Sequence, residues 1–551
     1  MSRLSWVRGA DEPPLLEQTI GQALDVAVAR WGDEIALISP FQTIRWTWRE
    51  LAARADALAA GLLDLGLAPG DRVGVWSPNG AQWTLTQFAA ARAGLILVTI
   101  NPAYRRSEVA FTLNKVGVKA LVAAERFKTS DYVGMIEDIA PEGAVPSLKS
   151  LIKIGGDPRP GWLDFDAVAA GAGPAALARV AEIGATLSHR DPINIQFTSG
   201  TTGSPKGATL SHHNILNNGR FVGRAQGLRA GDRLCIPTPL YHCFGMVMGN
   251  LACLTHGATM VYPAPVFDPL ATLQAIETER CAALYGVPTM FIAMLGHPRF
   301  KDFDVSSLRT GTMAGSPCPV EVMKAVAGDL HMPGVTIAYG MTETSPVSFQ
   351  TGLDDPLDRR VSTVGRVQPH LEVKIVGQAG EVTPRGVPGE ICTRGYSVML
   401  GYWDEPRRTA EVIDADGWMH TGDIGTIDED GYGNVVGRIK DMVIRGGENL
   451  YPREIEEFLY RHPKIADVQV VGLPDERYGE ELCAWIRLHP GEVADEADIR
   501  AFCAGQIAHH KVPRYVRFVD DFPMTVTGKV QKFVIRQTMI EELGLKAAET
   551  A

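Results

Sequence analysis

The sequence has no cysteine pair with the Cys-x-x-Cys spacing that zinc sites and redox dithiols use. Its eight cysteines are scattered along the chain, and most stand among apolar residues, as buried and reduced thiols do. They are Cys235, Cys243, Cys253, Cys281, Cys318, Cys392, Cys483 and Cys503. Neither a cysteine-based zinc site nor a redox motif is therefore predicted.

Long hydrophobic runs are also missing. The longest, near residues 88–100, is interrupted by Arg92 and is too short to cross a bilayer. The first residues lack the apolar core of a secretory signal, and acidic side chains follow from Asp11. We therefore expect no integral membrane segment and a cytoplasmic location; a short or cleaved organelle address is the alternative.

Basic charge is in deficit. The chain has 53 Lys and Arg against 64 Asp and Glu, a formal net charge of -11. Non-specific binding to nucleic acid requires basic surface that displaces counterions, so no nucleic-acid partner is expected. For the same reason, any phosphate site must be built from local hydrogen-bond donors.

The pattern of apolar residues indicates several domains, because 551 residues are too many for one hydrophobic core. Up to about residue 365, short apolar runs alternate with amphipathic stretches, which favours α/β layers with largely parallel sheet. Strands are expected at 72–76, 95–100, 120–123, 193–198 and 259–262, and helices at 48–65 and 266–279.

The pattern of expected secondary structure changes twice in the last third of the chain. After about Gly365, expected strands at 373–376, 389–394 and 433–436 are separated by Gly and Asp turns, as in a small β-rich subdomain. Near residues 438–441 a Gly-Gly loop and a proline suited to a first helical turn follow. We place a boundary at Lys440, which divides the chain into residues 1–439 and a small α+β domain of residues 440–551.

The most informative stretch is Thr-Ser-Gly-Thr-Thr-Gly-Ser-Pro-Lys-Gly at 198–207, between a strand-like and a helix-like segment. Its glycines let backbone N–H groups approach an anion, and its hydroxyls and lysine add donors and positive charge. The Gly-Lys-Ser/Thr ending of the Walker A loop is absent. A flexible linker is the alternative interpretation. The predicted phosphate-binding residues are Thr198, Ser199, Gly200, Thr201, Thr202, Gly203, Ser204, Pro205 and Lys206.

This stretch closely resembles the phosphate loop of the acyl-adenylate-forming (AMP-binding) superfamily. Further motifs follow in that superfamily's order and cover nearly the whole chain. They are PLYHCFG at 239–245, AGSP at 314–317, YGMTETSP at 339–346, GEICTRGYSVMLGYW at 389–403, TGD at 421–423, GRIKDMVIRGGENLYPREIE at 437–456 and PMTVTGKVQK at 523–532. Each motif alone is weak evidence for the superfamily, but seven in the expected order are strong evidence. The residues within the motifs are most similar to those of medium-chain fatty acyl-CoA synthetases.

The resemblance implies an α/β fold: a large N-terminal domain of two α/β sheets and a distorted β-barrel, followed by a small, mobile α+β C-terminal cap. It implies that ATP activates a carboxylic acid, here a fatty acid, as acyl-AMP with release of pyrophosphate. Coenzyme A then accepts the acyl group, giving acyl-CoA and AMP. ATP, Mg²⁺ and coenzyme A are the implied cofactors and co-substrates. The oligomeric state stays open, with a homodimer among the alternatives.

The resemblance also assigns roles around the nucleotide. Glu343 would hold Mg²⁺, since a carboxylate is a hard oxygen ligand; alone it would more often be a solvated loop residue. Asp423 would accept hydrogen bonds from both ribose hydroxyls, although a turn aspartate is its commoner use. The remaining implied contacts are Thr342 and Thr202 to phosphate, Tyr339, Gly340, Gly315 and Ser316 around adenine, and Arg438 to ribose.

Three further assignments concern catalysis and the cap. Lys529, by itself a surface lysine, would enter the site and offset charge that develops as the carboxylate attacks the α-phosphorus. His242 is expected beside the substrate carboxylate, with a packed core histidine as its rival. The cap would rotate at Lys440 and bring Gly446 and Gly447 toward a narrow pantetheine channel.

The apolar stretch CFGMVMGNLACLTHG, which follows His242, suits a pocket wall for an alkyl chain; a packed helix is the alternative. Within the same chemistry, an aryl-CoA ligase is the nearest rival function, and a peptide-synthetase subunit or a luciferase-like oxygenase fits less well. From another class, the chain could be a non-catalytic ATP- or acyl-binding regulator. Such a regulator often lacks the magnesium or lysine position, whereas this sequence has both.

Overall fold

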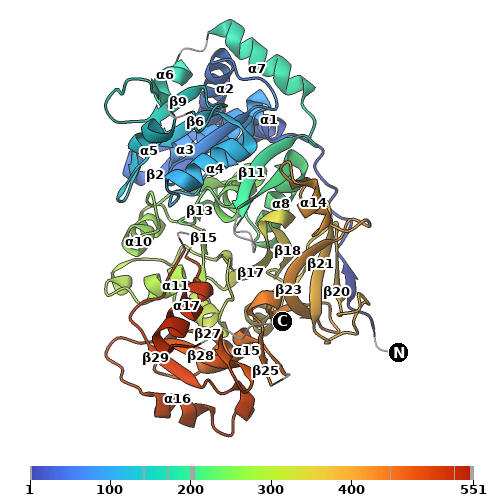
Figure 1. The fold of residues 1–551 in the computed structure, drawn as a ribbon. Helices are drawn as coiled ribbons and strands as arrows, with labels where there is room; N and C mark the ends of the chain where they lie inside the picture. Colours follow the sequence, from blue (N-terminus) through green and yellow to red (C-terminus); the bar gives the residue numbers. More distant parts are fainter. Residues whose placement is uncertain are drawn as a thin grey trace.

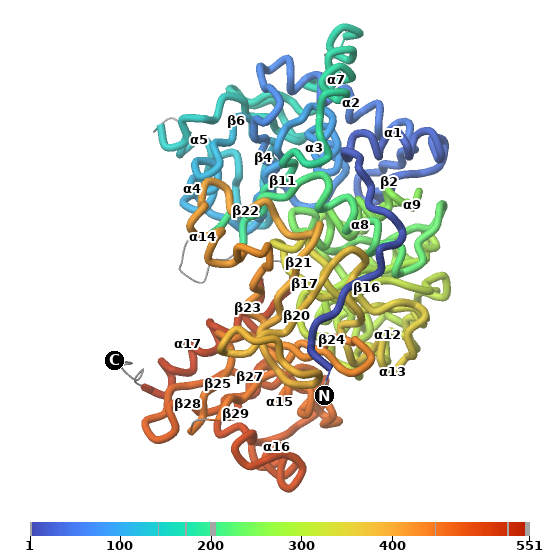
Figure 2. Tube along the Cα trace, turned by 90° about the vertical axis from the view of Figure 1, so that its right-hand side faces the viewer, coloured from blue at the N-terminus to red at the C-terminus, as the bar shows by residue number. Residues whose placement is uncertain are grey.

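A computed structural model describes residues 3–140, 143–170, 173–198, 205–446, 448–525 and 528–545. Four large β-sheets organise this part of the chain (Figures 1 and 2). Two carry helices on their faces, the third is an all-antiparallel barrel-like sheet, and the fourth belongs to the C-terminal residues at the bottom of Figure 1.

The first sheet has eight strands. In spatial order they are β10 (Leu163–Asp164), β9 (Ser150–Ile154), β6 (Val118–Ala124), β4 (Arg72–Trp76), β5 (Ile96–Thr99), β11 (Pro192–Thr198), β12 (Lys206–Ser211) and β22 (Gly401–Tyr402). Pairing is parallel from β10 to β11, and β12 and β22 add antiparallel pairs. The parallel strands are nearly continuous apolar runs because helices cover both of their faces.

The second sheet has nine strands. They are β19 (Arg366–Val367), β18 (Val347–Gln350), β17 (Gly334–Gly340), β16 (Thr310–Ala314), β15 (Ala283–Gly286), β13 (Arg233–Cys235), β14 (Thr259–Val261), β2 (Ile35–Ser39) and β3 (Ile44–Thr47). The six strands from β17 to β2 are parallel, and antiparallel strands close both edges.

Helices lie between the two sheets and on their outer faces. One hydrophobic cluster joins both sheets with α1 (Ile20–Trp31), α2 (Trp48–Asp64), α3 (Ala81–Ala93), α8 (His212–Ala225) and the π-helix η2 (Phe244–Leu251). Outside the first sheet pack α4 (Arg106–Val116) and α5 (Tyr132–Ile139). Outside the second pack α10 (Pro269–Thr278), α11 (Pro288–Leu295) and α12 (Val320–Gly328). The result is a five-layer αβαβα arrangement.

The remaining helices are shorter or peripheral. They are α6 (Phe165–Ala170), α7 (Pro174–Thr186), α9 (Ala252–His256), α13 (Leu357–Ser362), α14 (Pro406–Ala410) and the 3₁₀ turns η1 (Pro40–Gln42), η3 (Phe300–Asp302), η4 (Thr342–Thr344), η5 (Ile439–Asp441) and η6 (His509–Lys511). A small hairpin joins β7 (Arg126–Phe127) and β8 (Ser130–Asp131). No helix of the described residues combines the length and apolarity needed to cross a bilayer.

The third sheet is antiparallel throughout. Its strands are β1 (Trp6–Arg8), β20 (Leu371–Val376), β21 (Gly389–Gly395), β23 (Met419–Ile427) and β24 (Gly433–Arg438). The N-terminal segment, dark blue in Figure 2, runs along this part of the molecule and supplies the edge strand. The expected β-rich subdomain after Gly365 is thereby confirmed.

The C-terminal sheet combines β26 (Glu448–Leu450), β25 (Val443–Arg445), β28 (Gly479–Leu488), β27 (Ile465–Asp475) and β29 (Tyr515–Phe518). Helices α15 (Pro452–Leu459) and α16 (Glu496–Cys503) share a core with one face, and α17 (Lys532–Leu543) shares a core with the other. Two separate cores on one sheet make this a small α+β domain, as expected.

The expected strands and helices of the first two sheets are present, with ends that differ by a few residues. The strand-like and helix-like segments expected on either side of the phosphate-loop stretch are present as β11 and α8, whereas the strand between that stretch and the helix was not predicted. Residues 206–211 form β12, which pairs antiparallel with β11 and brings Thr198 opposite Lys206. Helix α8 begins afterwards, where Ser211 Oγ accepts from the Asn214 backbone N–H at 3.1 Å and Asn214 Oδ1 accepts from the Ser211 N–H at 2.8 Å.

Candidate active site

The carboxylate of Glu343 joins three segments that are distant in sequence. Thr198, at the end of β11, donates its hydroxyl to Glu343 Oε1 at 3.2 Å, and the Tyr402 hydroxyl of β22 donates to the same oxygen at 2.9 Å. The Met399 backbone N–H donates to the Glu343 carbonyl at 2.9 Å. Glu343 is only 5% exposed, so its carboxylate has lost its hydrogen bonds to water. The two hydroxyl donors compensate for that loss.

A second carboxylate lies where β17 meets the barrel-like sheet. Asp423 Oδ2 accepts a hydrogen bond from the Tyr339 hydroxyl at 2.8 Å, and its Oδ1 accepts from Arg438 Nε at 2.9 Å. Asp423 and Arg438 are direct partners in the ladder of β23 and β24, which explains their contact. Burial and the Asp423 charge together raise the pKa of the Tyr339 hydroxyl well above its usual value, so Tyr339 acts as a donor.

Two glycines lie at the ends of β17 and β16 beside these side chains. A Cβ added to Gly340 would lie 1.7 Å from the Pro346 carbonyl oxygen, so no other residue fits this turn after β17. Gly315, which follows β16, has φ +91°, a conformation that favours glycine. A Cβ placed there would lie 3.7 Å from Lys529 Cε. The C-terminal domain therefore reaches the end of β16 through Lys529.

Lys529 comes from the C-terminal domain and lies among charged groups of the large domain. Its segment is held by a hydrogen bond from the Thr289 hydroxyl to the Gly528 carbonyl at 3.2 Å. Burial lowers the pKa of the Lys529 ammonium to about 8; the Arg438 charge lowers it further, while Asp423 and Glu343 oppose the shift. The four side chains thus act on one another within a single site.

His242 and Cys243 form a neutral wall beside these charges. Burial, followed by the charge of Lys529, lowers the pKa of His242 to about 3, so its imidazole is uncharged at neutral pH. His242 Nδ1 accepts from the Phe244 backbone N–H at 3.2 Å, which leaves the proton on Nε2. The buried Cys243 thiol donates to Gln196 Oε1 at 3.2 Å, and burial raises its pKa to about 12. Behind them, all eight residues of η2 are buried.

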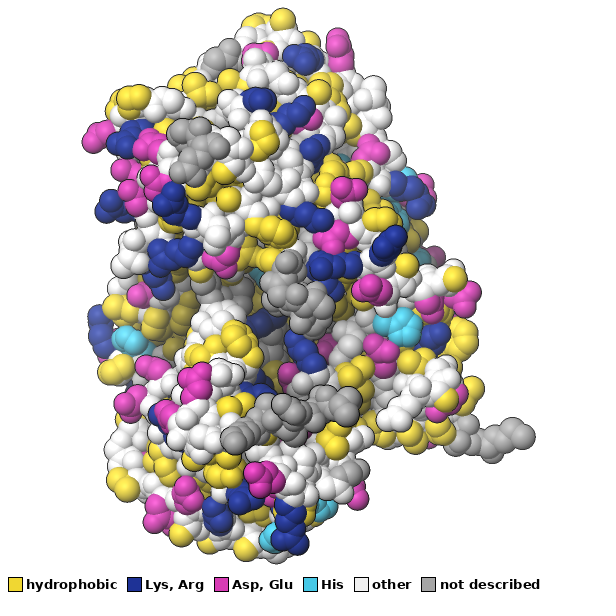
Figure 3. All heavy atoms as spheres, in the orientation of Figure 1, with side chains coloured by type: hydrophobic (Ala, Val, Ile, Leu, Met, Phe, Trp, Pro, Cys, Tyr) yellow, Lys and Arg dark blue, Asp and Glu magenta, His cyan; other side chains and the backbone are white. Residues whose placement is uncertain are grey.

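Lys206 completes the described part of the phosphate hairpin. Its ammonium lies 4.8 Å from the centre of the Tyr402 ring, the same ring whose hydroxyl binds Glu343. Figure 3 shows a hollow between the large domain and the C-terminal domain in which several basic side chains gather. A hollow with basic side chains beside two carboxylates suits a phosphorylated ligand that carries a metal ion.

The structure brings most of the predicted residues together. Direct hydrogen bonds join the 198 and 343 positions, and the 339 and 423 positions, so the segments on which the prediction rests are in contact. Ser316, Thr342 and Pro205 lie in the same segments and adjoin these contacts along the chain. Gly446 is not brought in: its N–H donates to the Tyr478 carbonyl at 2.8 Å inside the C-terminal domain. Six loop positions and one glycine lie outside the described residues: Ser199, Gly200, Thr201, Thr202, Gly203, Ser204 and Gly447.

Sequence reasoning missed Tyr402, Gln196 and Thr289. Tyr402 stands inside the GYSVMLGYW stretch, so the motif contained it, but no pattern shows that a hydroxyl 59 positions away reaches Glu343. Gln196 is a polar residue in an apolar strand, which was a usable signal, because a buried amide needs a partner. Thr289 follows Pro288 at the start of α11, and nothing in the surrounding sequence indicates that it contacts the C-terminal domain.

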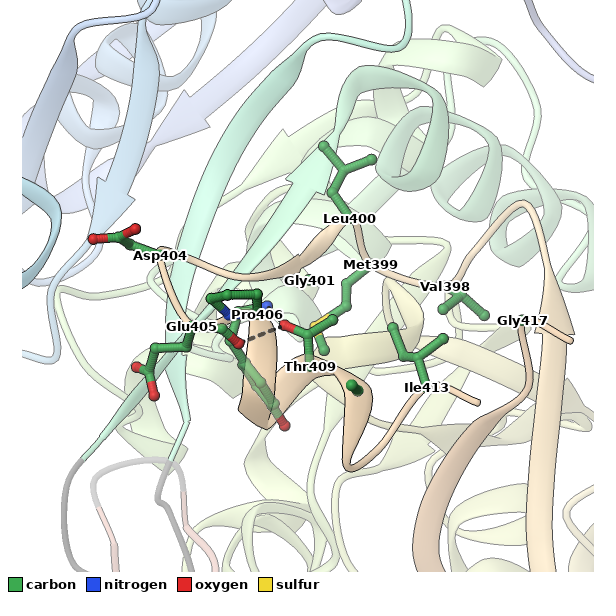
Figure 4. Close-up of a pocket in the computed structure, with 12 residues that line it drawn as sticks. Val398, Met399, Leu400, Gly401, Asp404, Glu405, Pro406, Thr409, Ile413 and Gly417 are labelled. Carbon is green, nitrogen blue, oxygen red and sulfur yellow. Dashed lines mark hydrogen bonds between the residues drawn. The ribbon is translucent and has the colours of Figure 1, made fainter. Parts of the chain in front are cut away.

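A separate hollow of about 720 Å³ lies on the segment that carries Tyr402 (Figure 4). Twelve residues between Val398 and Gly417 line it, and Figure 4 shows Leu400 pointing away from the cluster of Val398, Met399 and Ile413. Met399 and Tyr402 are shared with the Glu343 contacts. The hollow is thus a neighbour of the candidate site and does not contain the charged groups described above.

Two family models match the chain: the AMP-binding enzyme model over residues 24–403 and the AMP-binding enzyme C-terminal domain model over residues 454–529. The chain therefore belongs to the AMP-binding enzyme family.

Its relatives include acid–CoA ligases. The medium-chain acyl-CoA ligase ACSF2, mitochondrial, of Macaca fascicularis is 46% identical, over 98% of this chain and 90% of that protein. The structure of the anthranilate CoA ligase AuaEII with anthranoyl-AMP has a TM-score of 0.85 at 26% identity and covers 97% of this chain and 99% of that one. ATP-bound MatB from Rhodopseudomonas palustris has a TM-score of 0.83 at 29% identity, over 95% and 99%.

The relatives confirm the predicted superfamily and fold class. They contradict the cytoplasmic location, because the macaque protein and its bovine and human counterparts are all named mitochondrial. The physical basis of the error is that the absence of a secretory core says nothing about organelle import, which uses different signals.

Replacing Tyr402 by Phe should weaken nucleotide binding. The change removes one of two hydroxyl donors to the buried Glu343 carboxylate, and a hydrogen bond to a charged group contributes about 1.5–3 kcal/mol. We therefore expect a roughly ten- to hundredfold higher dissociation constant for ATP with magnesium, measured by isothermal titration calorimetry. Tyr432→Phe is the matched control, because Tyr432 also donates to a carboxylate, Asp355, but outside the site. Equal effects of both changes would contradict this role.

Proposed function

We propose that this chain is a fatty acyl-CoA synthetase that forms acyl-AMP from ATP and a fatty acid and then transfers the acyl group to coenzyme A. The observation that carries the proposal is that the Lys529 segment of the small domain lies against the large domain: the Thr289 hydroxyl donates to the Gly528 carbonyl at 3.2 Å, and a Cβ on Gly315 would lie 3.7 Å from Lys529 Cε. In the proposal, Lys529 thereby acts near a metal-binding carboxylate, Glu343, and a sugar-binding carboxylate, Asp423. Family membership and 46% identity to a medium-chain acyl-CoA ligase support the substrate class.

In this proposal the nucleotide spans the described contacts. Asp423 accepts hydrogen bonds from the ribose hydroxyls, with Arg438 as the second ribose contact and Tyr339 holding the carboxylate. Gly340 and Gly315 with Ser316 leave room for the adenine. The hairpin after Thr198, including Thr202 and the other loop residues, and Lys206 bind the phosphates, joined by Thr342.

The donor set also fits a magnesium ion. Glu343 offers a hard carboxylate oxygen, which is the ligand type that Mg²⁺ takes together with nucleotide phosphates. When bound, the ion neutralises phosphate charge. Thr198 and Tyr402 orient the Glu343 carboxylate through Oε1, so the geometry of this ligand is set before any metal arrives.

The acid lies between Lys529 and the neutral His242 wall. Lys529 offsets the negative charge that develops when the fatty carboxylate attacks the α-phosphorus. Since His242 is uncharged, it can contact the substrate carboxylate without forming an ion pair that would compete with Lys529. The alkyl chain extends along the apolar η2 segment. Each buried methylene contributes about 0.8 kcal/mol, so chain-length preference is graded and roughly fourfold per carbon.

The second half-reaction needs a different arrangement of the small domain. We propose that the chain hinges at Lys440, in the 3₁₀ turn between the barrel-like sheet and β25, and that residues 440–551 move as the cap. Gly446 and Gly447 would then line the pantetheine path. A homodimer stays a prediction.

The function is tested by incubating the protein with ATP, magnesium, coenzyme A and a graded set of alkyl and aryl acids, with thioesters identified by mass. We expect acid-dependent pyrophosphate release and thioesters of medium-chain alkyl acids in highest yield. An aryl-CoA ligase, the second candidate, would give aryl thioesters instead, as the likeness to an anthranilate ligase allows. Tight ATP binding with no pyrophosphate would support the non-catalytic regulator.

Lys529→Ala should separate the two half-reactions. Loss of one preorganised cation lowers an adenylation rate by roughly a hundred- to a thousandfold. Thioester formation from supplied acyl-adenylate should continue at a near-normal rate, since Lys529 acts only before that step. Single-turnover measurements of each half-reaction give the two rates, and equal losses in both would reject the assignment.

The pH dependence of adenylation follows from the lowered pKa of Lys529. Its ammonium is present below about 8 and is lost as the pH rises through that value. The kcat/KM for ATP, which reports on the free enzyme, should therefore fall by roughly tenfold per pH unit above pH 8. Pyrophosphate release between pH 6.5 and 9.5 measures this, with circular dichroism to verify the fold. A profile that stays flat to pH 9.5 would show that no group with this pKa is required.

A further inference from the structure

The segment that carries Asp423 is a bulge in the barrel-like sheet. Strand β21 pairs Glu390 with Ile424 and Cys392 with His420, so β23 advances four residues while β21 advances two. Thr421, Gly422 and Asp423 therefore stand opposite a single residue, Ile391. Bulges of this kind interrupt the ladder and re-aim a side chain, and they occur beside functional sites.

Side chains replace the ladder hydrogen bonds that the bulge removes. Glu390 Oε1 accepts from the Gly422 backbone N–H at 3.0 Å. The Thr421 hydroxyl donates to the Ile391 carbonyl at 2.8 Å and accepts from the Asp423 N–H at 3.2 Å. Because a buried backbone N–H without a partner is costly, these two side chains determine whether the bulge keeps its shape.

The Glu390 carboxylate is itself held in place. Its Oε2 lies 2.9 Å from His420 Nδ1, and the Cys392 sulfur lies 3.4 Å from the same nitrogen. The ligand atoms of these three residues lie within 4.8 Å of one another, which is close enough for a metal ion. Both carboxylate oxygens and the imidazole nitrogen are engaged in hydrogen bonds, however, so the trio works as a support for the turn.

The bulge presents Asp423 to its partners across the site. Gly422 has φ +71°, which lets the strand bend before Asp423 enters the ladder with Arg438. The carboxylate then meets the Tyr339 hydroxyl of a different sheet at 2.8 Å. A shift of the bulge would move both carboxylate oxygens at once, because Asp423 directly follows Gly422, whose N–H donates to Glu390.

We propose that Glu390 is a positioning residue for the nucleotide: through Gly422 and His420 it fixes the Thr421–Gly422–Asp423 bulge so that Asp423 meets the ribose hydroxyls. This inference rests on the proposed function, in which Asp423 binds ribose. Glu390 itself touches no reacting atom. Removing the Glu390 carboxylate should therefore abolish the preference for nucleotides that carry both ribose hydroxyls and leave acid binding unchanged.

The test compares ATP with 2′-deoxyATP and 3′-deoxyATP in pyrophosphate-release assays. We expect the unmodified enzyme to prefer ATP by roughly ten- to a hundredfold in kcat/KM, the effect of one hydrogen bond to a charged group. In Glu390→Ala this preference should fall below about threefold, with a KM for ATP about ten times higher and a KM for the acid within twofold. Glu390→Gln keeps an acceptor for the Gly422 N–H and should retain most of the preference.

Glu372→Ala is the matched control. Glu372 lies on the adjacent strand β20 and binds Arg394 in the same sheet, but it does not contact the bulge. Its variant should keep the full preference for ATP. Should Glu390→Ala fail to fold by circular dichroism, Thr421→Val removes the other two side-chain hydrogen bonds and should also erase the preference.

The outcomes separate the inference from the proposed function. A folded Glu390→Ala, or failing that Thr421→Val, that keeps the wild-type preference overturns the positioning role and leaves the function intact. An unmodified enzyme that uses all three nucleotides equally refutes the ribose contact of Asp423, and the inference falls with it.

Discussion

The buried Glu343 carboxylate is the contact on which the arrangement of the large domain depends. A charge that is 5% exposed must be compensated by hydrogen bonds, and its two hydroxyl donors come from β11 and β22 of the eight-stranded sheet. Glu343 itself follows β17 of the nine-stranded sheet. Satisfying this one carboxylate therefore ties the ends of two sheets together at the place where the phosphate hairpin begins. In the proposed function the same contact orients the ligand for Mg²⁺, so the stability of this junction and its proposed chemistry share one cause.

In the proposed function, charge balance explains why Lys529 is delivered from a second domain. Burial lowers the pKa of Lys529, which means that docking the cap without a ligand makes its ammonium less favourable. In the proposed function a nucleotide phosphate supplies the opposite charge and restores it. Docking and nucleotide binding then favour each other, as linkage requires. Arg438 repels the Lys529 ammonium, but its own charge is paired with Asp423, whose carboxylate also favours the ammonium.

The sequence allowed much of the fold and site to be predicted, for reasons that particular residues show. Strands such as β4 and β6 are apolar because both faces are covered, so their runs are visible in a single sequence. Asp423, Glu343 and Lys529 stand in motifs of fixed order. What could not be predicted are features set by contacts between distant residues: β12, which is stabilised by pairing with β11; the π-helix η2, which an apolar run does not distinguish from an α-helix; and the Tyr402–Glu343 bond.

The two proposed roles of the small domain exclude each other in this structure. Lys529 adjoins Gly315 and lies near the charges of the large domain, whereas the Gly446 N–H is bonded to Tyr478 within the small domain itself. Both glycine and lysine are attached to one sheet with its own cores, so they move together as a unit. An arrangement that brings Gly446 to the site must therefore withdraw Lys529. In the proposed function this structure therefore corresponds to the adenylating arrangement, and thioester formation would require a rotation large enough to exchange one face of the small domain for another.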